Sequence, residues 1–163
     1  MSDRWFDAYD GQTTDELLAL EPDYRIDSLV AAFEQALYQK AGELSAGERY
    51  ILAVEAIERE VNNGGYDQFF LNSSHDFIDV VEEALEAVGC PKTAAMTGDA
   101  IRALGLGESP TGEQAEAAVL AETPEVKAAL SACDDRYFAS DEPIADRLFA
   151  WIKENREQVK IGR

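Results

Sequence analysis

The least generic stretch of this chain reads Asn62-Asn63-Gly64-Gly65-Tyr66-Asp67-Gln68-Phe69-Phe70-Leu71-Asn72-Ser73. Gly64 and Gly65 permit a positive φ, and Asn63 tolerates the left-handed region, so a helix can end here and the chain can turn sharply. The aromatic side chains that follow would anchor this turn in the core. Gln68 and Asn72 have the spacing to bond each other or exposed backbone groups. The stretch predicts a rigid helix corner, and a small polar binding site is the alternative interpretation.

A strong helix signal precedes this corner. Ser45 and Glu48 have capping-box spacing, in which the hydroxyl and the carboxylate each accept a hydrogen bond from an unpaired backbone amide. We therefore expect a helix over residues 46–62, packed near the centre of the protein. Glu55 and Arg59 on this helix are predicted to form an i,i+4 ion pair.

Helix signals recur along the rest of the chain, whereas strand signals are nearly absent. Further helices are expected over residues 14–20, 27–40, 75–88, 91–104, 111–121, 124–139 and 142–157. Connections are short and no flexible linker separates two domains. The sequence predicts an all-α fold in a single compact, irregular domain of about seven helices, with an acidic N-terminal segment over residues 1–25 and an all-helical domain over residues 26–163.

The chain is strongly acidic. It carries 33 Asp and Glu against 14 Lys and Arg, a net charge of −19 over 163 residues. Much of this excess lies in three windows, residues 1–23, 76–91 and 103–126, which together contain one basic residue. Like charge repels nucleic acid and anionic lipid, so we expect no direct nucleic acid and no membrane partner. A protein partner, if one exists, would be basic.

The window that begins at residue 76 has a one-sided pattern. On a helix over residues 75–88, five acids would fall within a sector of about 100°; these are Asp76, Asp79, Glu82, Glu83 and Glu86. Glu113, Glu116 and the segment from Asp7 to Glu21 would extend this surface. We interpret these acids as a candidate partner-binding surface, and the alternative is an ordinary solvated helix face.

Residues for catalysis or metal binding are scarce. The only histidine, His75, has neither a nucleophile motif nor a set of metal ligands around it, so we expect a surface or capping residue. We therefore predict no enzyme, no metal and no cofactor. Cys90 and Cys133 form no CxxC motif and suit a reducing cytoplasm. A secretory signal and a run of about 18 apolar residues are both lacking, so a cytoplasmic protein is expected.

The motif at residues 62–73 resembles the one that marks the DNA-mimic protein family, a group of bacterial all-helical proteins that are mostly uncharacterised. The resemblance extends upstream through Arg49-Tyr50 and Glu60-Val61, and downstream to Asp134-Asp135-Arg136-Tyr137-Phe138. It covers roughly residues 26–157. It implies an all-α fold and, for the characterised type of member, an acidic dimer whose carboxylates imitate DNA phosphates. It does not imply an enzyme. The motif residues themselves are interpreted as structural; they are Asn62, Asn63, Gly64, Gly65, Tyr66, Gln68, Phe69 and Asn72.

Three hypotheses follow from the residues and the resemblance. The leading one is a non-catalytic protein that presents carboxylates to a basic DNA-binding protein such as a transcription factor. The second is that acidity serves only solubility or adaptation to salt. The third is self-association as a homodimer, because residues 147–163 contain five bases and two acids that would suit the acidic face of another copy.

Overall fold

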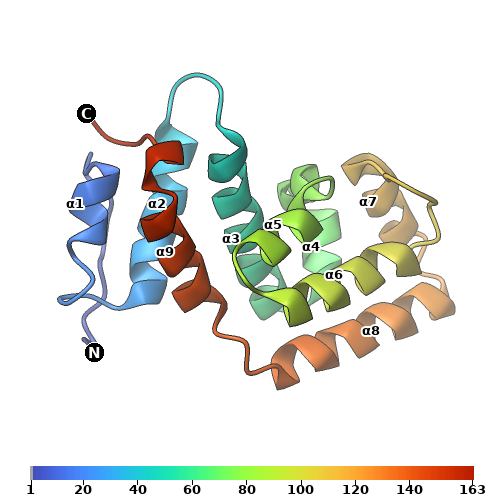
Figure 1. Ribbon diagram of the computed structural model, residues 1–163. Coiled ribbons are helices and arrows are strands. Elements are labelled where there is room, and N and C mark those ends of the chain that lie inside the picture. Colours follow the sequence, from blue (N-terminus) through green and yellow to red (C-terminus); the bar gives the residue numbers. More distant parts are fainter. Residues whose placement is uncertain (1) are drawn as a thin grey trace.

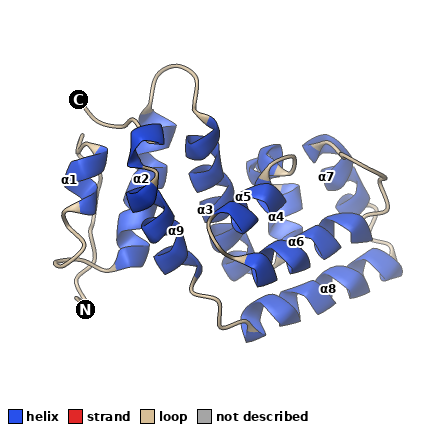
Figure 2. Ribbon diagram, in the orientation of Figure 1, coloured by secondary structure: helices blue, strands red, loops and turns tan. Residues whose placement is uncertain are grey.

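The computed structural model describes residues 2–163, and helices are the only regular elements in that range (Figures 1 and 2). The α-helices are α1 (Thr14–Leu18), α2 (Ile26–Gln39), α3 (Ala46–Gly64), α4 (Tyr66–Leu71), α5 (Val81–Ala87), α6 (Pro91–Ala103), α7 (Gly112–Leu120), α8 (Pro124–Ala139) and α9 (Ile144–Glu154). Two short 3-10 helices are η1 (Ser73–Phe77) and η2 (Arg156–Gln158). The predicted all-α fold is confirmed.

Helix α3 is the central element. Helices α1, α2 and α9 lie on one side of it, and α4 to α8 lie on the other (Figure 1). The predicted capping box is present, since the Ser45 hydroxyl accepts from the Glu48 amide and the Glu48 carboxylate accepts from the Ser45 amide. Ile51, Ile57 and Val61 have no exposed surface. Burial of apolar side chains on both sides therefore fixes α3 between the two groups of helices.

The corner after α3 differs in detail from the prediction. Helix α3 continues through Asn63 to Gly64, and only Gly65 adopts a positive φ, of 89°. Asn63 is therefore helical and does not use the left-handed conformation. Residues after Gly65 form the separate helix α4, which places Phe69 and Phe70 in the core with no exposed surface. The stretch is a corner between two helices.

The predicted helix over residues 75–88 is wrong. The chain forms η1, then a turn, and only then α5, which begins at Val81. Ile78 and Val80 are both buried, at 8% and 7% exposure. An α-helix would place residues two apart on nearly opposite sides, so both can reach the core only if the helix is interrupted.

The N-terminal segment packs against distant parts of the chain. The Arg25 amide donates to the Arg4 carbonyl at 2.8 Å, and the Phe6 amide donates to the Ser28 hydroxyl at 3.0 Å. In α1, the Thr14 hydroxyl donates to the Val159 carbonyl at 2.5 Å. The N-terminal segment therefore lies against the start of α2, and α1 lies against the C-terminal segment that follows η2. The helix expected over residues 142–157 is shorter than predicted, since α9 ends at Glu154 and η2 follows.

Candidate functional site

The seven acids of the predicted surface lie on separate elements. Asp76 is in η1, Asp79 is in the turn that follows, Glu82, Glu83 and Glu86 are in α5, and Glu113 and Glu116 are in α7. Because η1 and α5 are not one helix, the single stripe predicted over residues 76–86 does not form. The acids of α7 are instead brought to η1 by tertiary packing.

His75 joins η1 to α7. Its Nδ1 atom lies 3.3 Å from a carboxylate oxygen of Asp76, and its Nε2 atom lies 3.5 Å from a carboxylate oxygen of Glu116. The imidazole ring is packed against Gly112 so closely that a Cβ atom there would lie 2.1 Å from Nδ1. Glycine at the start of α7 therefore allows this helix to approach η1, and carboxylates from two distant segments flank one histidine.

The expectation that His75 is a surface or capping residue is wrong. The residue is only 9% exposed, and Nδ1 has no hydrogen-bond partner among the described residues. The sequence offered no sign of this burial, because α7 covers the ring from about 40 residues further along the chain.

Two of the predicted acids are neutralised by arginines. Asp79 lies 3.2 Å from the Arg49 guanidinium, and Glu82 lies 3.6 Å from that of Arg102. The other five have no Lys or Arg partner within the described chain, and we call these five the acidic surface; they are Asp76, Glu83, Glu86, Glu113 and Glu116. Four of them are exposed, and the Glu116 side chain is 41% exposed.

The acids of α1 and the residues after it do not extend the acidic surface. Basic residues of the C-terminal segment pair with them: Lys153 with Glu21 at 2.6 Å, Arg156 with Asp15 at 3.2 Å, and Arg163 with Glu16 at 2.8 Å. The negative charges of these acids are therefore neutralised locally by the positive charges of the C-terminal segment. Arg147 also pairs with Glu142, at 3.5 Å, so four of the five bases considered for contact with another copy are engaged within the molecule.

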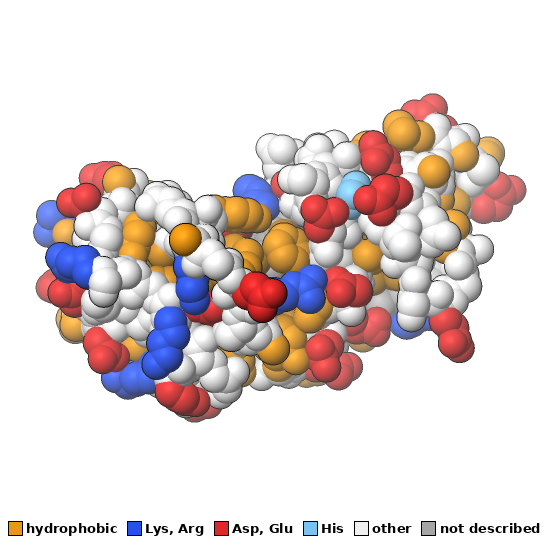
Figure 3. All heavy atoms as spheres, turned by 90° about the horizontal axis from the view of Figure 1, so that it is seen from above, with side chains coloured by type: hydrophobic (Ala, Val, Ile, Leu, Met, Phe, Trp, Pro, Cys, Tyr) orange, Lys and Arg blue, Asp and Glu red, His pale blue; other side chains and the backbone are white. Residues whose placement is uncertain are grey.

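Charge is consequently divided between two parts of the protein. Residues 66–142, from α4 to the end of the α8–α9 connection, carry 16 acids and 4 bases, whereas the remaining residues carry 17 acids and 10 bases. In Figure 3 most Lys and Arg side chains lie on the part that contains α1, α2 and α9, and Asp and Glu side chains flank the histidine on the other part. The excess negative charge thus resides mainly around α4 to α8.

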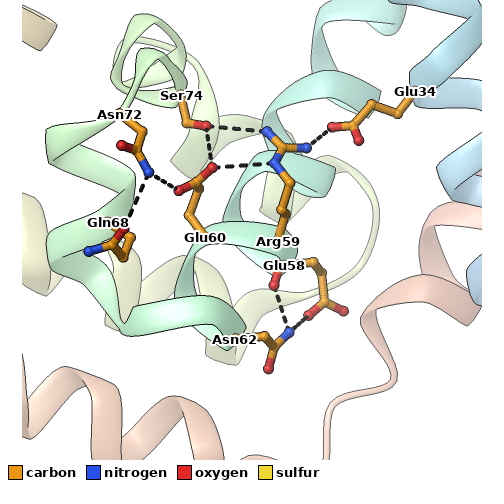
Figure 4. Close-up of polar contacts among 8 residues, drawn as sticks. All are labelled: Glu34, Glu58, Arg59, Glu60, Asn62, Gln68, Asn72 and Ser74. Atoms are coloured by element: carbon orange, nitrogen blue, oxygen red, sulfur yellow. Dashed lines mark hydrogen bonds and ion pairs between the residues drawn. The ribbon is translucent and has the colours of Figure 1, made fainter.

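The motif residues form a polar network at the corner between α3 and α4 (Figure 4). The Asn72 amide donates to the Glu60 carboxylate at 2.5 Å and approaches the Gln68 side-chain oxygen at 3.4 Å. The Ser74 hydroxyl also donates to Glu60, at 3.2 Å. Glu60 is 7% exposed, so these donors compensate the burial of its charge. Arg59 adds an ion pair to Glu60 at 3.3 Å.

Two further motif residues connect the corner to α8 and α6. The backbone amide of Tyr66 donates to the Asp134 carboxylate at 2.7 Å, and the Tyr66 hydroxyl lies 2.8 Å from the Thr97 hydroxyl. At Gly65 a Cβ atom would lie 2.5 Å from the same Asp134 carboxylate. Asp134 belongs to the downstream sequence that carried the family resemblance, but only the structure shows that it faces the corner.

The two asparagines of the motif lie at the end of α3. Asn62 donates to the Glu58 carbonyl and carboxylate, at 2.6 and 2.9 Å, whereas Asn63 is exposed.

The structure supplies no cluster of metal ligands. Among residues 2–163, no group of three or more His, Cys, Asp or Glu side chains is placed to hold a metal ion. None of the helices in that range is long and apolar enough to cross a membrane. Cys90 and Cys133 are buried free thiols, and burial raises the pKa of Cys90 to about 12.

Comparison with known proteins identifies a family. A family model described as DMP19-like protein matches residues 42–155. The match spans all of α3, the corner motif, the acidic surface and α9, and it is narrower than the predicted residues 26–157. Comparisons with curated proteins and with solved structures found no match.

Proposed function

Because this chain belongs to the DMP19-like protein family, we propose that it is a non-catalytic DNA mimic that presents its acidic surface to a basic DNA-binding protein. The observation that carries this proposal is the packing of α7 on η1, which places carboxylates from separate segments around His75. Duplex DNA carries about one phosphate charge per 1.7 Å of axis, so imitation requires charges gathered from several elements.

The distribution of ion pairs also supports the proposal. Within residues 2–163 the acidic surface lacks Lys and Arg partners, whereas Asp15, Glu16 and Glu21 are paired with bases of the C-terminal segment. If acidity served only solubility, no such difference between the two parts would be needed. An approaching basic partner would meet its strongest attraction at α5, η1 and α7.

A pair of charge-matched variants tests this function. The test variant replaces four acids of the acidic surface by glutamine, namely Glu83, Glu86, Glu113 and Glu116. The control variant replaces four N-terminal acids by asparagine, namely Asp7, Asp10, Asp15 and Asp23. Each immobilised protein is exposed to native lysate, and bound proteins are eluted with salt or with duplex DNA and identified by mass spectrometry.

We expect wild type and the control variant to retain a basic DNA-binding protein that both salt and DNA release. The test variant should lose it. Dissociation constants measured between 50 and 200 mM salt should then weaken steeply for the captured partner. Equal capture by both variants, or a partner that duplex DNA does not displace, would contradict the proposal and leave the solubility explanation in its place.

A further inference from the structure

A cleft lies away from the acidic surface, between the N-terminal segment, α2, α3 and the start of α9. One cavity of about 350 Å³ contains Trp5 from the N-terminal segment, Glu34 from α2 and Glu55 from α3. Glu58 lines this cavity and two adjoining ones of about 500 and 220 Å³. In Figure 4, Glu58 and Asn62 point away from the Glu60 network toward the segment between α8 and α9. The three cavities therefore share a wall along α3.

The lining of the first cavity is strongly acidic. It contains four carboxyl groups, Asp27, Glu34, Glu55 and Glu58, and one base, Arg59. Three of these carboxyl groups already have partners, because Asp27 pairs with a neighbouring arginine, Glu34 pairs with Arg59, and Glu58 accepts from Asn62 and from a tyrosine hydroxyl of α8. Glu55 has no hydrogen bond or ion pair within the described chain.

The predicted Glu55–Arg59 ion pair is therefore wrong. Arg59 instead reaches Glu34 on α2 and Glu60 on its own helix, and it also donates to Ser74. Packing of α2 against α3 brings Glu34 within reach of this guanidinium, and the sequence pattern of one helix could not indicate that competition. Among the described residues, Glu55 is left as the one carboxyl group of the cavity that lacks a hydrogen-bond donor.

The surroundings of Glu55 favour its protonated form. Burial raises the pKa of Glu55 to about 8, and the negative charges of Glu34, Glu58 and Asp27 act in the same direction, against Arg59. The adjoining cavity adds further acids, since Asp3 of the N-terminal segment and Asp146 of α9 line it together with Arg25. At neutral pH the carboxyl group therefore retains a proton that a cation placed beside it would displace.

The remaining lining suits a flat cation on an aliphatic chain. Val30, Ala31 and Ala145 provide apolar wall, and the Trp5 indole at the cavity is 47% exposed. The guanidinium of Arg25 already stacks on this indole, 5.4 Å from the ring centroid. A guanidinium group can stack on an indole and bond carboxylates in a bidentate manner, whereas an ammonium group is a compact, strongly hydrated charge.

We infer that this cleft binds the guanidinium group of an arginine side chain presented by a protein partner, with Glu55 as the carboxylate that pairs with it. On binding, the neutral carboxyl group releases its proton to solvent and the resulting carboxylate bonds the guanidinium. This inference goes beyond the proposed function, because none of the cleft residues belongs to the acidic surface and the cleft can act whether or not that surface imitates DNA.

A single-arginine peptide tests the inference. Acetyl-Gly-Arg-Gly-amide is titrated into the full-length protein, and binding is followed by NMR at constant ionic strength. The arginine keeps its charge throughout, so a pH dependence belongs to the protein. Between pH 7 and 9 the ionised fraction of Glu55 rises from roughly a tenth to roughly nine tenths, so the affinity should rise about tenfold. The matched citrulline peptide, which is neutral, should not bind.

Two charge-matched variants locate the site. Glu55→Gln should bind the arginine peptide with an affinity that does not change between pH 7 and 9. Glu113→Gln removes one charge from the acidic surface and should keep the tenfold rise. Thermal unfolding followed by circular dichroism checks that both variants fold. A wild-type protein that binds no arginine peptide, binds the citrulline peptide equally well, or shows no pH dependence overturns the inference, as does a Glu55→Gln variant that keeps the tenfold rise.

These outcomes are separable from the test of the proposed function. Loss of partner capture in the variant of the acidic surface concerns α5 and α7, whereas the titration of Glu55 concerns α3 and the cleft. Either result can fail while the other holds.

Discussion

Glu48 and Glu55 lie two turns apart on α3 and have opposite electrostatic environments. Glu48 is 1% exposed, and its carboxylate accepts from Lys40 at 2.6 Å and from the amides of Ser45 and Lys160, each at 2.8 Å. Burial raises the pKa of Glu48, but these donors outweigh burial and hold it below the ordinary value. Glu55 has no hydrogen-bond donor within residues 2–163, and its pKa is raised to about 8. The difference shows that partners, more than depth, decide whether a carboxyl group is charged in this protein.

The two groups should also affect stability in opposite pH ranges. The lowered pKa of Glu48 contributes stability that is present above its ordinary value near 4.5 and is lost as pH falls through the folded value. Because the pKa of Glu55 is raised in the folded protein, this carboxyl group ionises at a lower pH in the unfolded chain than in the folded one. Stability is therefore lost as pH rises from about 4.5 to about 8, and the cost is constant above that.

The largest effect is expected from Glu48→Ala. The change leaves the Lys40 ammonium and two backbone amides without their acceptor, so we expect a loss of about 3 kcal/mol in the free energy of unfolding at pH 7. Urea unfolding of both proteins measures it. The difference from wild type should shrink in acid, where the carboxylate of the wild type becomes protonated. A loss that is the same at pH 3 and pH 7 would contradict the role assigned to the charge.

An effect of opposite sign and no larger size is expected from Glu55→Gln. Glutamine resembles the protonated carboxyl group and removes the pH-dependent cost, so the variant should be more stable than wild type by up to about 3 kcal/mol at pH 7. At pH 4.5 the two proteins should be nearly equal. Urea unfolding at several pH values provides the comparison. A variant less stable than wild type at pH 8 would show that the Glu55 charge has a partner in the folded protein.

Glu34→Gln should bring the pKa of Glu55 closer to that of Glu48. It removes the strongest of the negative charges that raise the pKa of Glu55, and it frees Arg59 to approach Glu55. We expect the pKa of Glu55 to fall from about 8 by roughly one unit. NMR titration of the side-chain carboxyl carbon measures this shift. An unchanged pKa would show that the charge of Glu34 does not contribute to the raised pKa of Glu55.

The smallest effect is expected from Asp15→Asn, which breaks an exposed ion pair. The side chains of Asp15 and Arg156 are 74% and 53% exposed, so solvent screens their attraction. We expect a change in unfolding free energy within about 0.5 kcal/mol. Urea unfolding at low and high salt checks it, and a loss comparable to that of Glu48→Ala would contradict the distinction between buried and exposed pairs.

Local sequence signals predicted the beginnings of several helices. The predicted capping box at Ser45 marks the start of α3, because it satisfies backbone amides within one turn. The structure has the same arrangement at Thr13 and Thr111, where α1 and α7 begin. Pro91 and Pro124 begin α6 and α8 for a similarly local reason. These signals need no tertiary contact, which is why the all-α fold was predictable.

The sites were less predictable. The five acids over residues 76–86 were predicted to share one helix face, but burial of both Ile78 and Val80 interrupts that helix. The motif was recognised from its amino-acid sequence, yet its contacts with Glu60 and Asp134 depend on how α3 packs against α4 and α8. The charge of Glu55 depends on Glu34, which lies on another helix.

Local capping, periodicity and composition were enough to establish the helical class, the family resemblance and the large excess of negative charge. Packing of distant segments was needed to set which acids of the described chain have no basic partner, how His75 is buried against α7, and why Glu55 has no hydrogen-bond donor there. Electrostatic environments depend on distances between groups on different helices, and those distances exist only once the helices have packed.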